Sequence, residues 1–280
     1  MSSDKKIDLG LTGYDELFMD DQGRAEAKLP RIYDIPLSEI DEFPDHPFKV
    51  KMDEDMDQLV ESIKERGVIT PITLRQKEDG RYELVSGHRR KKACEIAGFT
   101  TIKAEIRDLS RDEAIILMVE SNLQRSVILP SEKAFSYKMR LEAMKRQAGR
   151  PSKDNSGPVV QNFSRDNLGD SAGESGRQIS RYIRLTELIP QILDMVDEGR
   201  IAFRPAVEIS YLLKSEQEVL LEAMSFTDAT PSLAQAIKMK DFSKNGKLTP
   251  EVIESIMSEE KPNQKEKFSF KASSFWDLSC

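Results

Sequence analysis

The stretch RYELVSGHRRKKACEIAG, residues 81–98, carries the pattern that decides the first part of the fold. Its first residues alternate as a strand of a hairpin does, and Ser86 and Gly87 then open a helix that ends at Gly98. A strand that turns through glycine into a helix exposes backbone N–H groups to an anion such as phosphate. Because Arg89 and Arg90 add forked donors beside the turn, the sequence predicts an anion site here. The alternative is a basic helix face that is simply solvated.

On both sides of this stretch, strand and helix patterns alternate. Acids in a first turn and Gly67 just past the end predict a helix over 53–66, and Ser110 with Glu113 predicts a capped helix over 110–123. Strands are expected at 32–40, 68–74, 81–85 and 101–107. Residues 31–128 are therefore expected to form an α/β domain.

The second half has only helical patterns. Ser131 is expected to cap a helix over 131–148, and residues 149–161 have the composition of a linker. Shorter helices are expected at about 165–172, 176–188, 190–198, 205–213, 215–224, 232–240 and 249–258. We therefore expect an all-α domain over 129–258, preceded by a flexible arm at 1–30 and followed by a poorly ordered tail at 259–280.

Composition limits the classes of protein to which the chain can belong. Its 280 residues suffice for two domains, and no apolar run is long enough for a membrane span or a secretory signal, so we expect a cytoplasmic protein. Two cysteines and two histidines supply neither a disulfide framework nor a zinc cluster. The net charge of −7 hides an asymmetry, because residues 67–200 hold 23 Lys and Arg against 19 Asp and Glu.

Residues 165–188 have helix-turn-helix spacing, with Ser175 as the expected cap of the second helix. Basic residues repeat along one face of that helix, and apolar residues lie on another. This division predicts DNA binding: we expect base-edge or phosphate contacts from Ser175, Arg177, Gln178, Ser180, Arg181 and Arg184, and phosphate contacts from the basic run that includes Lys145, Arg146 and Arg150. The alternative is a surface helix whose arginines are only solvated.

A third segment, Glu120 to Arg125, places a carboxylate, an amide and a guanidinium within about one helical turn. These groups are suited to a nucleotide triphosphate and its metal ion. With Gly67 to Ile72 and Gly87 to Ala93, the segment completes an ordered series that resembles the ParB/RepB/Noc family of partition proteins. That family carries a G-x-x-Q-P-I segment, a G-E-R-R-x-x-A box and an E-N-x-x-R box, and the resemblance extends from about Ile35 to Tyr211.

The resemblance implies a ParB/sulfiredoxin-like α/β domain that binds CTP with Mg²⁺ and closes as a sliding clamp on DNA. By position, it implies that the nucleotide is held by Thr70, Gly87, His88, Arg89, Arg90, Asn122 and Arg125, and the metal ion by Glu120 and Asn122. The sequence departs from the family at Thr70 (usually Gln), His88 (usually Glu) and Ser121, since Glu120 lies one position early. A shift of one residue turns a helical side chain by about 100°, so CTP binding is favoured over hydrolysis, and any CTPase activity is expected to be weak.

The function that the resemblance implies is that of a dimeric, CTP-regulated partition protein. It would recognise a centromere-like site on double-stranded DNA of a chromosome, plasmid or mobile element. Residues 7–14 of the arm would contact a ParA-type ATPase, and no membrane would be involved. The alternative of a different class is a helix-turn-helix transcriptional regulator without a nucleotide switch. A sulfiredoxin-like reductase is disfavoured, because Gly87 stands where those enzymes have their cysteine.

Overall fold

The computed structural model describes residues 31–125, 127–148 and 173–259 of the chain. The chain divides into two compact units, Met1–His46 with Val50–Ala114, and Pro47–Lys49 with Ile115–Cys280. The first contains a sheet and helices and the second is helical, which confirms the predicted fold class. The predicted arm, the first helix of the predicted helix-turn-helix and nearly all of the predicted tail lie outside the described residues.

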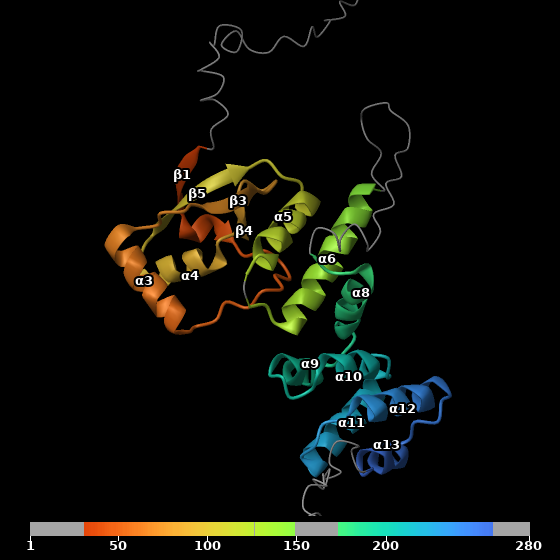
Figure 1. Ribbon diagram of the computed structural model, residues 1–280. Coiled ribbons are helices and arrows are strands. Elements are labelled where there is room, and N and C mark those ends of the chain that lie inside the picture. Colours follow the sequence, from red (N-terminus) through yellow and green to blue (C-terminus); the bar gives the residue numbers. More distant parts are fainter. Residues whose placement is uncertain (1–30, 126, 149–172, 260–280) are drawn as a thin grey trace, which may run out of the picture. The chain divides into compact units, whose positions relative to one another are not determined.

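The first unit is built on a five-stranded mixed sheet with the strand order β1-β5-β3-β4-β2. Figure 1 labels β1, β5, β3 and β4 of this sheet. Its strands are β1 (Ile32–Pro36), β2 (Ile40–Asp41), β3 (Ile72–Gln76), β4 (Tyr82–Ser86) and β5 (Thr101–Arg107). β3 and β4 form the predicted antiparallel hairpin, while β3 and β5 are parallel. The carboxyl end of β4 is therefore next to the start of β3, and the predicted anion site lies at this edge.

Helices α3 (Glu54–Arg66) and α4 (His88–Ala97) lie side by side in the first unit (Figure 1). Met56, Val60 and Ile63 of α3 pack with Ala93 and Cys94 of α4 and with buried strand residues. Asp53 caps α3, and Gly98 ends α4 in the left-handed conformation. The bounds predicted for both helices are therefore confirmed to within one residue.

Two predicted strands are shorter in the structure, and a proline accounts for each difference. The strand expected over 32–40 is interrupted after Pro36 by a 3-10 turn, Leu37–Glu39. The strand expected over 68–74 begins only at Ile72, after Pro71. Pro36 is the last paired residue of β1, and β3 begins directly after Pro71, in keeping with the lack of an N–H that proline could donate to a neighbouring strand.

Helix α5 (Arg111–Leu123) has the predicted capping box, in which Ser110 and Glu113 each accept the other's backbone N–H. The division between the two units falls inside this helix, after Ala114, whereas the sequence predicted a boundary at 128. An ion pair from Glu120 to Arg140, on the next helix, helps to explain why the end of α5 belongs to the second unit.

Helix α6 (Pro130–Ala148) begins one residue before Ser131, so the cap predicted at Ser131 is wrong. Proline is favoured at the first helical position because it has no N–H to leave unsatisfied there. Ser131 instead donates its hydroxyl to Asp197, at 2.5 Å, and its backbone N–H to the same carboxylate.

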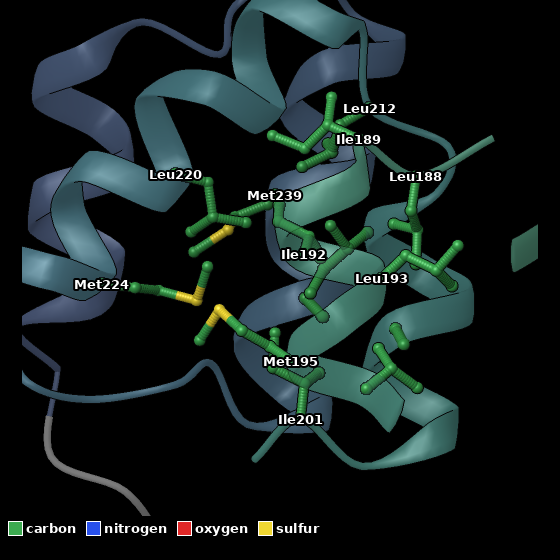
Figure 2. Close-up of a cluster of buried hydrophobic side chains, with 14 of the residues drawn as sticks. Leu188, Ile189, Ile192, Leu193, Met195, Ile201, Leu212, Leu220, Met224 and Met239 are labelled. Carbon is green, nitrogen blue, oxygen red and sulfur yellow. The ribbon is translucent and has the colours of Figure 1, made fainter. Parts of the chain in front are cut away.

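The remaining helices are α8 (Gly176–Leu185), α9 (Pro190–Asp197), α10 (Phe203–Ile209), α11 (Lys214–Thr227), α12 (Leu233–Lys244) and α13 (Pro250–Met257). Most of their buried apolar side chains form one core, in which Ile192, Met195, Leu220, Met224 and Met239 lie together (Figure 2), whereas Ile179 of α8 packs with Tyr137 of α6. None of the helices in the described residues is long and apolar enough to cross a membrane.

Candidate functional site

The strand-to-helix turn at Gly87 has a conformation that only glycine adopts readily. Gly87 has φ 106°, and a Cβ atom built there would lie 2.6 Å from Cγ2 of Ile72. No side chain caps the helix at Gly87, and its first turn contains no acid. The N-terminus of α4 therefore keeps the features of an anion site that the sequence predicted.

Arg89 reaches away from α4 to the beginning of α3. Its Nη2 atom lies 2.9 Å from Oδ1 of Asp53, whose carboxylate also accepts the backbone N–H of Met56. The hydrogen bond from Arg89 holds the pKa of Asp53 below its usual value. Asp53 thus supplies an anionic partner of the type that a phosphate would offer, whereas the sequence pattern predicted it only as the first residue of the helix over 53–66.

Arg90 fastens the turn to the loop before β3. Its Nη1 atom donates to the carbonyl oxygens of Thr70, at 2.5 Å, and Pro71, at 2.6 Å. Burial lowers the pKa of the Arg90 guanidinium. The structure therefore brings Thr70, Gly87 and Arg90 together as predicted, with the backbone of Thr70, not its side chain, as the contact.

His88 and Lys91 point into the first unit. The His88 ring stacks on His46 with 3.6 Å between ring centroids, and Lys91 pairs with Glu42 and Glu95. His88 and Lys91 are each only 6% exposed. His88, predicted to bind nucleotide, is instead part of the packing, because its ring is covered. The alternative of a fully solvated basic face is wrong for the same reason at Lys91.

Cys94 is fully buried on the inner side of α4. Burial raises the pKa of its thiol, which disfavours the thiolate that a redox-active cysteine requires. The position of this side chain argues against reductase chemistry at α4.

The predicted E-N-x-x-R box lies on the second unit. Glu120 and Arg125 contribute to a cavity of about 500 Å³ that is also lined by Lys133, Tyr137 and Arg140. The guanidinium of Arg125 lies 5.5 Å from the ring centre of Phe48. This cavity brings Glu120 and Arg125 together, but Asn122 is not among its lining residues.

The two predicted metal ligands are engaged by the protein itself. The carboxylate of Glu120 lies 2.6 Å from Nη2 of Arg140, a residue that is only 6% exposed. The Asn122 amide donates to the Met118 carbonyl at 2.8 Å. Among residues 31–125, 127–148 and 173–259, no three His, Cys, Asp or Glu side chains gather as a metal site. The side chains present do not fit an Mg²⁺ ion held by the protein.

Helix α8 presents distinct faces to the core and to the surroundings. Ser175 caps it by accepting the backbone N–H of Gln178, as predicted, while Ile179 and Leu185 are buried. Arg177 and Arg181 are exposed. Ser180 donates its hydroxyl to the carbonyl of Gly176, which leaves its oxygen as an acceptor on the helix surface.

Arg184, predicted to contact DNA, is held by the helical unit. Its Nη2 atom donates to the Ser210 carbonyl at 2.7 Å, and its guanidinium lies 4.2 Å from the ring centre of Tyr211. These contacts fix the end of α8 to α10, so Arg184 has a structural role that spacing alone could not reveal.

The predicted phosphate contacts near the end of α6 are only partly described. Lys145 and Arg146 are exposed in the last turn of α6, and Arg150 lies outside the described residues. Arg140, another member of the same basic run, is buried and paired with Glu120. The exposed charge of this run is therefore smaller than the sequence suggested.

Comparison with known proteins gives a consistent result for the first part of the chain. Residues 21–123 match the family model described as the ParB N-terminal domain. The chain is 30% identical over 180 residues to the chromosome-partitioning protein Spo0J of Thermus thermophilus, covering 63% of this chain and 60% of that protein. It is 30% identical over 156 residues to the probable chromosome 1-partitioning protein ParB of Deinococcus radiodurans, covering 56% and 48% respectively.

Among solved structures, the chain is similar to C-terminally truncated ParB from Caulobacter crescentus complexed to the centromeric parS site. The sequence identity is 21%, the TM-score is 0.43, and the match covers 80% of this chain and 98% of that one. The chain spans about half to three fifths of the length of the two curated relatives above.

Proposed function

We propose that this chain, whose residues 21–123 match the ParB N-terminal domain, is a member of the ParB family: a dimeric, sequence-specific DNA-binding protein that recognises a centromere-like site in the segregation of a chromosome, plasmid or mobile element. We propose further that CTP regulates its hold on DNA. The family model covers residues 21–123, and the second part of the chain supplies a basic helix of the type that enters a major groove.

The observation that carries the DNA-binding proposal is the division of α8 into a buried and an exposed face. Ile179 and Leu185 anchor the helix in the core, so Arg177, Gln178 and Arg181 extend from a fixed support. Arginine and glutamine side chains near the N-terminus of such a helix form paired hydrogen bonds with base edges. A fixed support matters because base readout requires these donors to be placed accurately.

The proposal that CTP binds rests on the turn at Gly87 and on the family to which the first unit belongs. The uncapped N–H groups of α4 would receive phosphate oxygens, and Arg89 would exchange the Asp53 carboxylate for one of them. Arg90 would keep the loop at Thr70 and Pro71 in place. CTP would supply a charged triphosphate that orders these groups, and we assign no side chain of the chain to Mg²⁺.

Calorimetry of the full chain with each of the four nucleoside triphosphates, with and without Mg²⁺, tests the nucleotide proposal. Of the four nucleotides, we expect only CTP to bind. Arg89→Ala should weaken CTP binding by about 10- to 150-fold, since a charge-assisted hydrogen bond contributes about 1.5 to 3 kcal/mol. Lys92→Ala is the matched control, because Lys92 belongs to the same helix but pairs with Glu95. Equal CTP affinity in the wild type and the Arg89 variant would remove the site assignment.

One set of observations favours a second candidate, a helix-turn-helix regulator of the same architecture without a nucleotide switch. Arg89, Arg90 and Glu120 already have partners within the chain. The rate at which the protein dissociates from a closed DNA circle that carries its recognition site separates the candidates. A CTP-dependent clamp should become slower to leave the circle when CTP is added, whereas the dissociation of a plain regulator should not change.

The proposed partners follow from the same family assignment. We propose a second copy of the chain as the dimer partner, and a ParA-type ATPase as the partner of residues 7–14, which lie outside the described residues. Stimulation of the ATPase by the full chain, and its loss when residues 7–14 are deleted, would test the second assignment.

A further inference from the structure

Helices α11 and α13 enclose a groove that the proposed DNA-binding function does not use. The groove has a volume of about 580 Å³ and lies within the second unit. Val219, Ala223 and Phe226 line it from α11, and Pro250 at the start of α13 and Ser258 just after its end line the other side. Because the α11 residues recur at helical spacing, they form a continuous apolar stripe along one side of the groove.

Phe226 is the residue that makes this groove unusual. Its side chain is 93% exposed, whereas Ala223, one turn earlier, is only 8% exposed. A phenylalanine that remains in water forgoes the stabilisation that burial of such a large apolar side chain contributes. The groove thus combines a covered floor with an aromatic side chain that has no apolar cover among the described residues.

The charge at the groove has a single sign. Glu222 and Glu254 are among its lining residues, and no lysine, arginine or histidine is. Both acids are exposed. An occupant with aromatic groups for the stripe and basic groups for the rim would therefore be complementary to this surface.

The chain itself contains such a segment directly after α13. Residues 261–276 hold four lysines against one acid, Glu266, and four aromatic residues. In an extended segment, Phe268 and Phe270 would lie on one face, and Lys265, Lys267 and Lys271 on the other, because successive side chains alternate. The aromatic face suits the stripe, and the long lysine side chains can reach the acids at the rim.

The tail starts where the groove ends. Ser258 lines the groove, and the ten residues from there to Phe268 can span up to about 33 Å when extended, whereas α13 itself is about 12 Å long. The reach is sufficient for Phe268 to return along the groove. A tethered segment also has a high effective concentration, so even weak intrinsic affinity fills the site.

We propose that residues 265–271 dock into the groove between α11 and α13 of the same chain, with Phe268 and Phe270 against Phe226. The second aromatic pair, Phe275 and Trp276, is a less suitable occupant because Asp277 follows it and no lysine lies beyond Lys271. The docked segment covers the exposed Phe226, and its lysines face Glu222 and Glu254.

Fluorescence anisotropy with a labelled peptide of residues 261–274 tests the proposal on the full chain. The wild-type tail should compete with the peptide, whereas Phe268→Ala with Phe270→Ala should free the groove and tighten peptide binding by about ten-fold or more. Adding Phe226→Ala to that variant should remove most of the gain. Phe226 is exposed, so its replacement leaves the core unchanged, and circular dichroism verifies that the variants are folded.

The matched control is the full chain with Phe275→Ala and Trp276→Ala, which should bind the peptide as weakly as the wild type. In the chain with Phe268→Ala and Phe270→Ala, charge reversal by Glu222→Lys with Glu254→Lys should weaken peptide binding. Added salt should weaken peptide binding when both glutamates are retained. The proposal is overturned if the peptide binds the wild type and the chain with Phe268→Ala and Phe270→Ala equally, or if adding Phe226→Ala does not change the peptide affinity. It is also overturned if competition by the tail disappears as the chain is diluted, because a second copy would then supply the occupant.

Discussion

At the scale of single residues, Gly87 determines whether β4 can turn into α4. Its positive φ value and the close approach of Ile72 are separate constraints, and only glycine meets both. Gly98, at the other end of α4, also has a positive φ value, but a Cβ atom there would meet nothing within 4 Å. The two glycines therefore allow conformational strain to be separated from steric exclusion.

We predict that Gly87→Ala lowers the free energy of unfolding by about 2 to 4 kcal/mol, because left-handed strain and overpacking against Ile72 add. Gly98→Ala should cost only about 1 to 2 kcal/mol, since strain alone applies there. Urea denaturation of the full chain, followed by circular dichroism, measures both values. Equal losses would mean that Ile72 moves aside at no cost.

The ion pair between Arg89 and Asp53 gives a prediction in pH. The pKa of Asp53 is lowered in the folded state, so the stability that the pair contributes is present above the ordinary aspartate pKa of about 4 and is lost as the pH falls through the lower folded-state value. Asp53→Asn keeps a residue that caps helices well but removes the charge. Its destabilisation should therefore be seen at pH 7 and should shrink towards acidic pH in denaturation series.

At the scale of helices and strands, patterns within about 15 residues were sufficient for most of the fold. The spacing of apolar residues and the flanking glycines predicted α3, α4 and β5 to within a residue. Pro36 and Pro71 shortened two strands, although their effect on pairing was readable from the sequence. The predicted strand boundaries were wrong where a single proline interrupted a longer alternating pattern.

Contacts between distant segments could not be predicted in this way. Arg140 belongs to the basic run and Arg184 was predicted to contact DNA, but Arg140 pairs with Glu120 and Arg184 donates to the backbone of Ser210. Both partners lie at least 20 residues away in sequence. For the same reason, the sequence identified Arg89 as an anion-binding residue but not Asp53 as the anion that it meets.

Gln217 shows how one buried polar side chain can join several helices of the second unit. Its Oε1 atom accepts the N–H of Ile189 at 2.8 Å, and its Nε2 atom donates to the carbonyls of Glu187 and Leu212, each at 3.1 Å. The residue is only 1% exposed. These bonds connect the start of α11 with the segment between α8 and α9.

We predict that Gln217→Ala lowers the free energy of unfolding by about 2 to 4 kcal/mol, because it leaves the Ile189 N–H and the Leu212 carbonyl without the partner they have, while the Glu187 carbonyl keeps its bond from Lys214. Gln191→Ala is the matched control: Gln191 is exposed on α9, and its replacement should cost less than about 0.5 kcal/mol. Thermal and urea denaturation of the full chain compare the two. A loss at Gln217 no larger than that of the control would indicate that water replaces the bonds.

At the scale of the whole molecule, a protein with a net charge of −7 must bind a polyanion through a local surface. The exposed residues of α8 and the last turn of α6 supply positive charge in the helical unit, while residues 1–66 hold 18 Asp and Glu against 9 Lys and Arg. The acidic first part should repel non-specific DNA. Binding should therefore depend strongly on the few exposed cations and on salt.

The last prediction separates base readout from phosphate contact. Arg177→Ala and Gln178→Ala should each cost about 1 to 3 kcal/mol on a duplex selected from a random pool, and little on a scrambled duplex, because base contacts are lost. Lys145→Ala should weaken binding to both duplexes and reduce the slope of log affinity against log salt by about one unit, because a phosphate contact is lost. Arg184→Ala should lower stability instead, since Arg184 is held by Ser210 and Tyr211. Anisotropy titrations at several salt concentrations measure the first three variants, and urea denaturation measures Arg184→Ala. Equal losses on both duplexes for Arg177→Ala and Gln178→Ala would mean that α8 contacts only the phosphate backbone, and another part of the helical unit would then have to read the sequence.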